Sequence, residues 1–230
     1  MKYLNYVLRA VFVLCVPLFF LSASIAVAFN SPWLYEYGFK KYDVPAVTGI
    51  SLSELNKAGS GLIEYFNSDD RLIDLVVTRN GQPFTLFNER EILHLLDVKE
   101  LVQLDYAIVI VTGLFLLVYS AVFLARSTSQ WPQLPKNLIC GSILTLLLIG
   151  SAGMIALIDF RWFFLQFHLI SFANDLWMLN PATDYLIMMF PQGFWFDATL
   201  LCTGMTVFMA VIAGTISVCL LRSRSEGGAA

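Results

Sequence analysis

Four long apolar runs alternate with polar segments along the chain. The runs cover residues 11–29, 106–125, 138–158 and 199–221. A run of about 20 apolar residues in a helix crosses a hydrocarbon core of about 30 Å. We therefore expect four membrane-spanning helices. The first run also contains Ala26-Val27-Ala28, a small-x-small pattern typical of signal-peptide cleavage sites, but its length favours a retained span.

The polar segment of residues 30–105 carries the signals of a small α+β domain. Ser51 and Glu54 have the spacing of a capping box and predict a helix. A β-branched run leads to Asn80-Gly81, a strong signal for a two-residue hairpin turn. A further helix is predicted from Asn88, because an N-cap residue type is followed here by two glutamates in the first turn.

The segment of residues 159–198 is rich in Phe and Trp and is interrupted at Asn180-Pro181 and at Pro191-Gln192-Gly193. This composition suits helices that lie in the membrane interface. Polar groups are costly in such a setting unless they are paired or hydrated, so they favour a polar pocket. They are Arg161, His168, Asn174, Asp175, Asp184 and Asp197.

The fold class that follows is an all-α polytopic membrane protein. It has four transmembrane helices, a small α+β extracytoplasmic domain at residues 30–105 and an aromatic interfacial loop at residues 159–198. Basic residues flank the spans at Lys2 and Arg9, at Arg126 and Lys136, and at Arg222 and Arg224. The positive-inside rule then places residues 1–10, 126–137 and 222–230 in the cytoplasm, with both termini. The two polar segments face outward.

Composition agrees with this picture and excludes one class of partner. Hydrophobic residues make up 58% of the chain and charged residues 13%, with a mean hydropathy of +0.71. The net charge of -3 and the lack of a basic cluster argue against nucleic acid. Cys15, Cys140, Cys202 and Cys219 all fall in apolar runs, so we expect no disulfide framework, thiolate metal site or cysteine nucleophile.

The candidate chemistry centres on the two histidines of the chain, His94 and His168. Glu91, His94 and Asp97 recur at i, i+3 spacing on one helix face. Taken singly, His94 reads as a helix-surface residue and His168 as an interfacial aromatic. Taken together, two imidazoles beside carboxylates on the same side of a membrane are suited to accept and donate protons near neutral pH.

Other kinds of site remain open. Glu91-x-x-His94 is the spacing of carboxylate-rich di-metal helices, although it occurs once, and a single zinc could use His94, His168 and one carboxylate. No G-x-S-x-G motif is present for a serine nucleophile. Asp159, Arg161, Asp175 and Asp184 are expected to form caps or ion pairs, whereas Asn174-Asp175 is placed to orient an imidazole or bind a polar head group.

Three motifs carry a resemblance to a known family. They are N-E-R-E-x-x-H-L-x-D-V-K from Asn88, F-H-x-x-x-F-x-N-D-x-W-x-L-N-P-x-T-D from Phe167, and F-P-x-x-F-W-F-D from Phe190. They resemble a family of bacterial four-span membrane proteins that includes the lipoprotein intramolecular transacylase Lit. The resemblance runs through essentially the whole chain and is most specific at residues 88–99 and 166–197.

The resemblance implies an acyltransferase of the bacterial cell membrane with its active site on the outer face. Its partners are membrane lipids and lipoproteins whose N-terminal cysteine carries a diacylglyceryl group. The sn-2 acyl chain moves to the free α-amino group and gives the lyso form, without a cofactor. The catalytic residues are then His94 and His168. The residues expected to bind or orient the substrate are Glu91, Asp97, Asn174, Asp175, Arg161 and Trp177.

The residues themselves fit that reaction. The substrate amine is already a nucleophile, and with a pKa of about 7.7 to 8.0 it can give its proton to a histidine at little cost. The other histidine can polarise the ester or protonate the departing alkoxide. Two alternatives stay open: a membrane metalloenzyme that uses Glu91, His94 and His168, and a non-enzymatic membrane protein that binds lipid or peptide.

Overall fold

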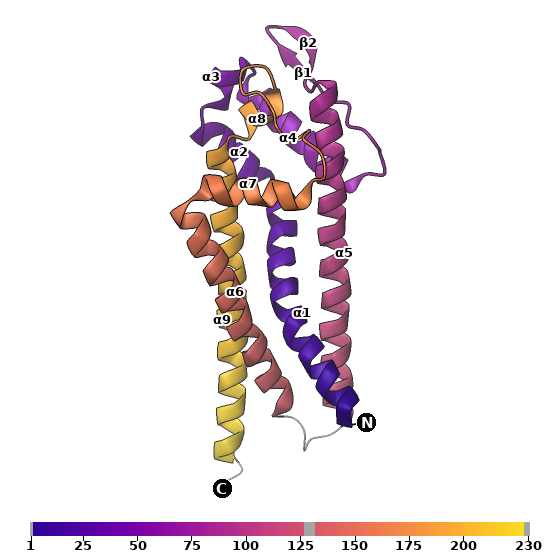
Figure 1. Ribbon diagram of the computed structural model, residues 1–230, viewed down its shortest axis with the longest axis vertical. Coiled ribbons are helices and arrows are strands. Elements are labelled where there is room, and N and C mark those ends of the chain that lie inside the picture. The colour runs from indigo at the N-terminus through magenta and orange to yellow at the C-terminus, as the bar shows by residue number, and fades with distance from the viewer. Residues whose placement is uncertain (1, 127–131, 228–230) are drawn as a thin grey trace. The chain divides into compact units, whose positions relative to one another are not determined.

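A computed structural model describes residues 2–126 and 132–227 (Figure 1). The expected cytoplasmic loop at 126–137 and tail at 222–230 therefore lie partly outside the described residues. The elements in chain order are α1 (Lys2–Phe29), α2 (Pro32–Lys41), α3 (Val44–Thr48), α4 (Leu52–Asn67), β1 (Val76–Arg79), β2 (Gln82–Thr85), α5 (Glu89–Arg126), α6 (Gln133–Ile158), α7 (Phe160–Ser171), α8 (Tyr185–Met189) and α9 (Gln192–Gly227).

Four helices of the described chain are long and apolar enough to cross a membrane. They are Tyr3–Phe29 of α1, Glu89–Ala125 of α5, Gln133–Ile158 of α6 and Gln192–Ser223 of α9. Each contains one of the four predicted runs. One prediction was too fragmented, because the helix expected from Asn88 and the span expected at 106–125 form a single helix, α5. Apart from Arg126 at its end, the charged residues of α5 precede Tyr106, so its apolar part begins there.

The chain divides into two compact units. The first unit comprises Met1–Ile25, Tyr106–Met154 and Leu201–Ala230, and it holds most of the apolar helical sequence. Small residues allow close packing within it. A Cβ atom on Gly141 of α6 would lie 2.7 Å from Cβ of Val16 of α1, so these helices approach where no side chain intervenes. Thr206 of α9 is fully buried and donates a hydrogen bond to Ser24 of α1 at 3.0 Å.

The second unit comprises Ala26–Asp105 and Ile155–Leu200, so both segments predicted to face outward fall in one unit. Its helix α4 is capped by Ser51, which accepts a hydrogen bond from the Glu54 N–H, as the capping-box pattern predicts. The predicted hairpin is present. Asn80 and Gly81 have φ angles of 51° and 77°, the left-handed conformation that a two-residue hairpin turn requires.

The aromatic segment of this unit forms α7, a loop and the short helix α8. Asp159 caps α7, since its carboxylate accepts the Trp162 N–H at 2.9 Å. Helix α7 lies crosswise to the first half of α5 (Figure 1). The predicted interruption at Asn180-Pro181 lies within the loop between α7 and α8. At the second one, Pro191 separates α8 from α9, whereas Gln192 and Gly193 already belong to α9.

Candidate active site

The first turn of α5 is fixed by a reciprocal cap. Asn88 Oδ1 accepts the Glu91 N–H at 3.1 Å, and Glu91 Oε2 accepts the Asn88 N–H at 2.8 Å. This capping box satisfies two backbone donors that a helix start leaves free. Arg90, His94 and Asp97 follow one another on one face of α5, because they are four and three residues apart.

Glu91 reaches beyond its own helix. Its side chain is fully buried, and Oε1 accepts the backbone N–H of Leu186 at 2.6 Å. Burial raises the pKa of this carboxyl, and the two backbone donors oppose that shift. Glu91 thus ties the start of α8 to the start of α5. The structure gives no contact between Glu91 and His94 among the described residues, so its expected role in orienting the imidazole stays a prediction.

The two histidines come together. His94 on α5 and His168 on α7 are 7% and 9% exposed, and their ring centroids are 6.4 Å apart. They are 74 positions apart in the chain, so only the packing of α7 on α5 brings them into one site. At this separation one functional group can contact both rings.

His168 is held in a defined tautomer within an aromatic enclosure. Its Nδ1 lies 2.7 Å from the carbonyl oxygen of Phe164, and a carbonyl only accepts, so Nδ1 carries the proton and Nε2 keeps a lone pair. The Phe164 and Trp177 rings lie 4.4 Å and 4.8 Å from the imidazole. Burial lowers the pKa of His168, and the hydrogen bond to Phe164 opposes that shift.

His94 is the more strongly perturbed ring. Burial, and next the nearby His168, lower its pKa to about 4, while Asp97 acts in the opposite direction. Its Nδ1 is buried and has no hydrogen-bond partner among residues 2–126 and 132–227. Phe172 packs against the ring with centroids 5.1 Å apart. Both imidazoles are therefore neutral near pH 7.

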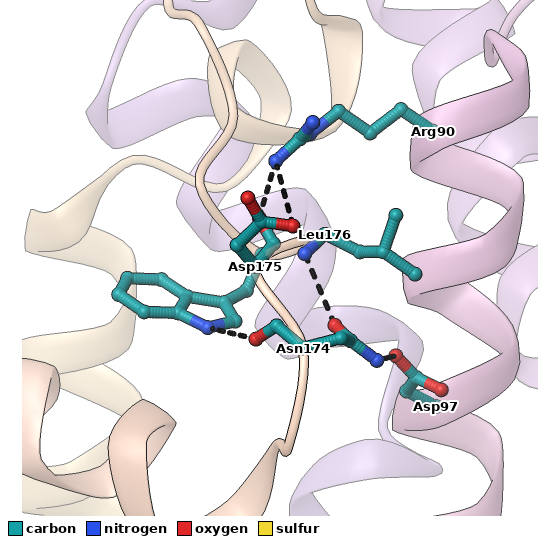
Figure 2. A network of polar contacts seen from close by, with 6 residues as sticks. Arg90, Asp97, Asn174, Asp175 and Leu176 are labelled. Atoms are coloured by element: carbon teal, nitrogen blue, oxygen red, sulfur yellow. Dashed lines mark hydrogen bonds and ion pairs between the residues drawn. The ribbon is translucent and has the colours of Figure 1, made fainter.

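A loop is fastened to α5 on either side of His94. Asn174 donates a hydrogen bond from Nδ2 to Asp97 at 2.9 Å, and Arg90 donates to the backbone oxygen of Asp175 (Figure 2). Asn174 Oδ1 also accepts the Leu176 N–H at 3.0 Å, which shapes the turn. Asp97, Asn174 and Asp175, expected to bind or orient the substrate, thus hold the loop to α5.

The hydrogen bonds that hold the loop to α5 also bear on the surroundings of His168. Trp177 follows the turn and donates its Nε1–H to the backbone oxygen of Asn174 at 2.9 Å. The same indole lies against His168. The loop therefore connects the face of α5 that carries His94 to the ring that encloses His168. Arg161, the remaining expected site residue, is exposed on the first turn of α7 and has no ion pair within the described chain.

The zinc alternative requires a carboxylate beside both histidines. Among the described residues, no group of three or more His, Cys, Asp or Glu side chains is placed to hold a metal. The carboxylate proposed for that set, Glu91, binds two backbone N–H groups instead.

Sequence reasoning missed two members of the site. Arg90 could have been found from its spacing of four residues before His94. The Phe164 carbonyl carries no sequence signal, because any residue type provides the same oxygen.

Three comparisons place the chain among known proteins. A family model described as lipoprotein intramolecular transacylase Lit matches residues 10–195. A protein of Aquifex aeolicus (strain VF5), described as uncharacterized, is 24% identical over 203 residues, which are 88% of this chain and 89% of that protein.

Solved structures share the fold. An in meso structure of the membrane integral lipoprotein intramolecular transacylase Lit from Bacillus cereus matches with a TM-score of 0.84 at 18% identity, covering 98% of this chain and 100% of that one. A structure of the same protein with one histidine replaced by alanine matches with a TM-score of 0.79 at 18% identity, covering 98% and 97% of the two chains.

Proposed function

This chain belongs to the family of the lipoprotein intramolecular transacylase Lit, and from that premise we propose that it transfers an acyl chain within a bacterial lipoprotein. The acyl chain leaves the sn-2 oxygen of the diacylglyceryl group and joins the α-amino group of the N-terminal cysteine. One ester C–O bond breaks, one amide C–N bond forms, and the amine proton ends on the glycerol oxygen. The total mass does not change, and no further acyl donor is required.

The observation that carries this proposal is the pair of buried, neutral histidines at 6.4 Å. The reaction needs a proton acceptor for the attacking amine and a proton donor for the departing oxygen. It needs no nucleophile from the enzyme, since the substrate amine attacks the ester. Burial lowers the pKa of each ring, which keeps both imidazoles available in the neutral form.

The tautomer of His168 supports an assignment of roles. Its Nδ1–H is committed to the Phe164 carbonyl, so Nε2 is the free acceptor, and we assign His168 as the base that takes the amine proton. His94, whose Nδ1 has no hydrogen-bond partner among the described residues, is then the ring that donates a hydrogen bond to the ester oxygen, and His168 passes the amine proton on to the departing glycerol oxygen, so that both rings end neutral. Binding amine and ester in one site supplies further rate through proximity.

The location of the site follows the expected topology. The chain is a membrane protein with four apolar helices. We place it in the bacterial cell membrane with both termini in the cytoplasm, because the basic residues flank the spans on one side. His94 and His168 then face outward, where lipoproteins display their modified cysteine.

The test is acyl transfer by the purified protein on a synthetic diacylglyceryl lipopeptide. Tandem mass spectrometry distinguishes the N-acylated product from the substrate at the same total mass. His94→Ala and His168→Ala should each reduce the rate by about 10² to 10⁴-fold, the usual contribution of general acid or base catalysis. The double variant should be little slower than the poorer single one, because the two rings act as a unit.

Leu93→Ala and Leu169→Ala are matched controls, since each removes an exposed neighbour of one histidine from the same helix. Both should retain near-native rates. If an alanine variant at either histidine kept near-native conversion, that ring would not be catalytic. Lipopeptide binding without any conversion would favour the binding-protein alternative. Stoichiometric zinc in the purified protein, together with loss of activity when a chelator removes it, would favour the metalloenzyme.

A further inference from the structure

The β1–β2 hairpin has one covered edge and one open edge. In an antiparallel pair, alternate residues direct their backbone N–H and C=O groups to the partner strand and the others direct them outward. The register pairs Val77 with Phe84, and the Leu86 N–H donates to the Leu75 oxygen at 2.9 Å. Thr78 and Thr85 therefore direct their backbone groups outward, on opposite edges of the hairpin.

The two edges differ in whether another element of the unit covers them. On the β1 edge, the outward N–H of Thr78 donates to Glu54 of α4 at 2.7 Å, so α4 covers this edge. On the β2 edge, the outward N–H of Thr85 has no backbone or side-chain acceptor among the described residues. Thr85 is also exposed. Pro83, the other outward-facing residue of β2, has no N–H, so Thr85 supplies the outward donor of this strand, and both residues supply outward carbonyl oxygens that another strand can pair with.

A cleft of about 170 Å³ runs beside this open edge. It is lined by residues 84–88, Glu91, Thr183 and Tyr185. Tyr185 is fixed in place, because its hydroxyl accepts a hydrogen bond from Arg79 at 2.6 Å and its ring packs 5.0 Å from that of Phe84. Tyr185 therefore has a fixed position in the wall of the cleft, and the outward N–H of Thr85, which also lines it, is available as a donor.

The cleft and the candidate active site lie in the same unit and share the first turns of α5. Asn88 and Glu91 line the cleft, and His94 lies one helical turn after Glu91. Asn88 and His94 are separated by about 9 Å along the helix axis, a distance that about three extended residues span. A peptide whose first amine lies at His94 can therefore reach Asn88, which lines the cleft, with roughly its fourth residue, and the residues that follow can lie along β2.

We propose that this cleft binds the polypeptide of the substrate lipoprotein as an added β-strand along β2. The inference rests on the proposed function, because it assumes a lipidated peptide whose amine lies at the histidines. In strand addition, main-chain hydrogen bonds supply affinity and a side pocket receives alternate side chains. This mode suits substrates that share a modified cysteine and differ in the residues that follow, since every peptide offers the same backbone.

The test compares diacylglyceryl lipopeptides of about two and about eight residues, which lie on either side of the reach estimated from the helix geometry. The wild-type protein should have the higher kcat/KM on the longer peptide. Thr85→Pro removes the outward N–H and leaves the bonds between β1 and β2 intact, and proline is tolerated at such edge positions. It should lower the preference for the longer peptide about five-fold or more, the effect of one backbone hydrogen bond.

Val76→Pro is the matched control, because Val76 pairs with Thr85 and directs its N–H to the opposite edge. It should keep the wild-type preference. An equal loss in Val76→Pro and Thr85→Pro would overturn the inference, as would equal kcat/KM of the wild-type protein for the two lengths.

A second measurement does not depend on the folding of any variant. Backbone N-methylation of the longer lipopeptide, one residue at a time, should weaken binding to the wild-type protein at alternate positions from about the fourth residue onward, because a β-strand directs its N–H groups to alternate sides. Uniform or absent effects would overturn strand addition.

The same peptides separate this inference from the proposed function. Lipopeptides with an acetylated α-amine cannot react, so their affinity reports binding alone. Alternating N-methyl effects on these blocked peptides support the cleft even if acyl transfer is never observed. Acyl transfer with no dependence on peptide length or N-methylation would leave the proposed function intact and refute the cleft.

Discussion

At His94 the protein keeps an imidazole away from water and beside a second imidazole. Both effects disfavour a charge on the ring and lower its pKa to about 4. A ring in this state is neutral near pH 7. The burial of His94 also has a consequence for the stability of the protein.

The stability of the protein should fall on acidification because of His94. Its folded pKa is about 4, below the ordinary value of 6.5, so the unfolded chain binds more protons between these values. The neutral ring contributes stability above about pH 6.5 that is lost as the pH falls toward about 4. Thermal unfolding in detergent should show this decrease for the wild type and a smaller one for His94→Asn, which cannot titrate. Equal decreases would mean that His94 is not held neutral by the fold.

The residues of the site differ in how far the sequence could predict them. His94 and His168 could be paired from the expected topology alone, since both lie in segments predicted to face the same side of the membrane. The tautomer of His168 and the binding of Glu91 to the Leu186 N–H could not, because they depend on backbone groups of α7 and α8. Hydrogen bonds to a main chain leave no residue-specific pattern.

At the level of elements, the sequence of α5 explains why the helix does not break near Tyr106. Residues 89–112 contain neither glycine nor proline, so nothing interrupts the helix where its apolar run begins. The charged residues before Tyr106 bound the apolar run, but the helix continues through them. The apolar pattern therefore predicted the span correctly and the helix incompletely. His94 lies in the part of this continuous helix that precedes the apolar run.

Helix α6 offers a matched pair of glycines that tests the packing within the first unit. A Cβ atom at Gly141 would meet Val16 of α1 at 2.7 Å, whereas one at Gly150 would meet nothing within 4 Å. Gly141→Ala should destabilise the protein by about 1 to 3 kcal/mol through overpacking. Gly150→Ala should be neutral or slightly stabilising, because alanine favours a helix. Thermal unfolding measures both, and equal behaviour of the two variants would contradict the close approach of α6 to α1.

For the whole molecule, the four apolar runs were sufficient to predict the membrane helices. They could not predict that residues 26–105 and 155–200 form one compact unit, because that grouping depends on contacts between segments far apart in the chain. The Glu91–Leu186, Asp97–Asn174 and Lys41–Asp197 hydrogen bonds are contacts of this kind. The orientation across the membrane remains a prediction from the basic residues.

Labelling of single cysteines tests that orientation. The four native cysteines are free and can be replaced by Ala or Ser to give a background without thiols. Gln82 is exposed on β2, and Lys136 is exposed at the start of α6. In intact cells an impermeant thiol reagent should label Gln82→Cys directly and Lys136→Cys only after the membrane is disrupted. The reverse pattern would place the histidines on the cytoplasmic side.

The central claim, that the acyl chain moves within one lipoprotein molecule, is tested most directly by an isotope crossover. The purified protein is given an equal mixture of two lipopeptides, one with a deuterated sn-2 acyl chain on a heavy-labelled peptide and one with neither label. Tandem mass spectrometry of the N-acylated products should find the heavy acyl chain only on heavy peptide and the light acyl chain only on light peptide. Mixed products, or the absence of any N-acylated product, would contradict intramolecular transfer by this protein.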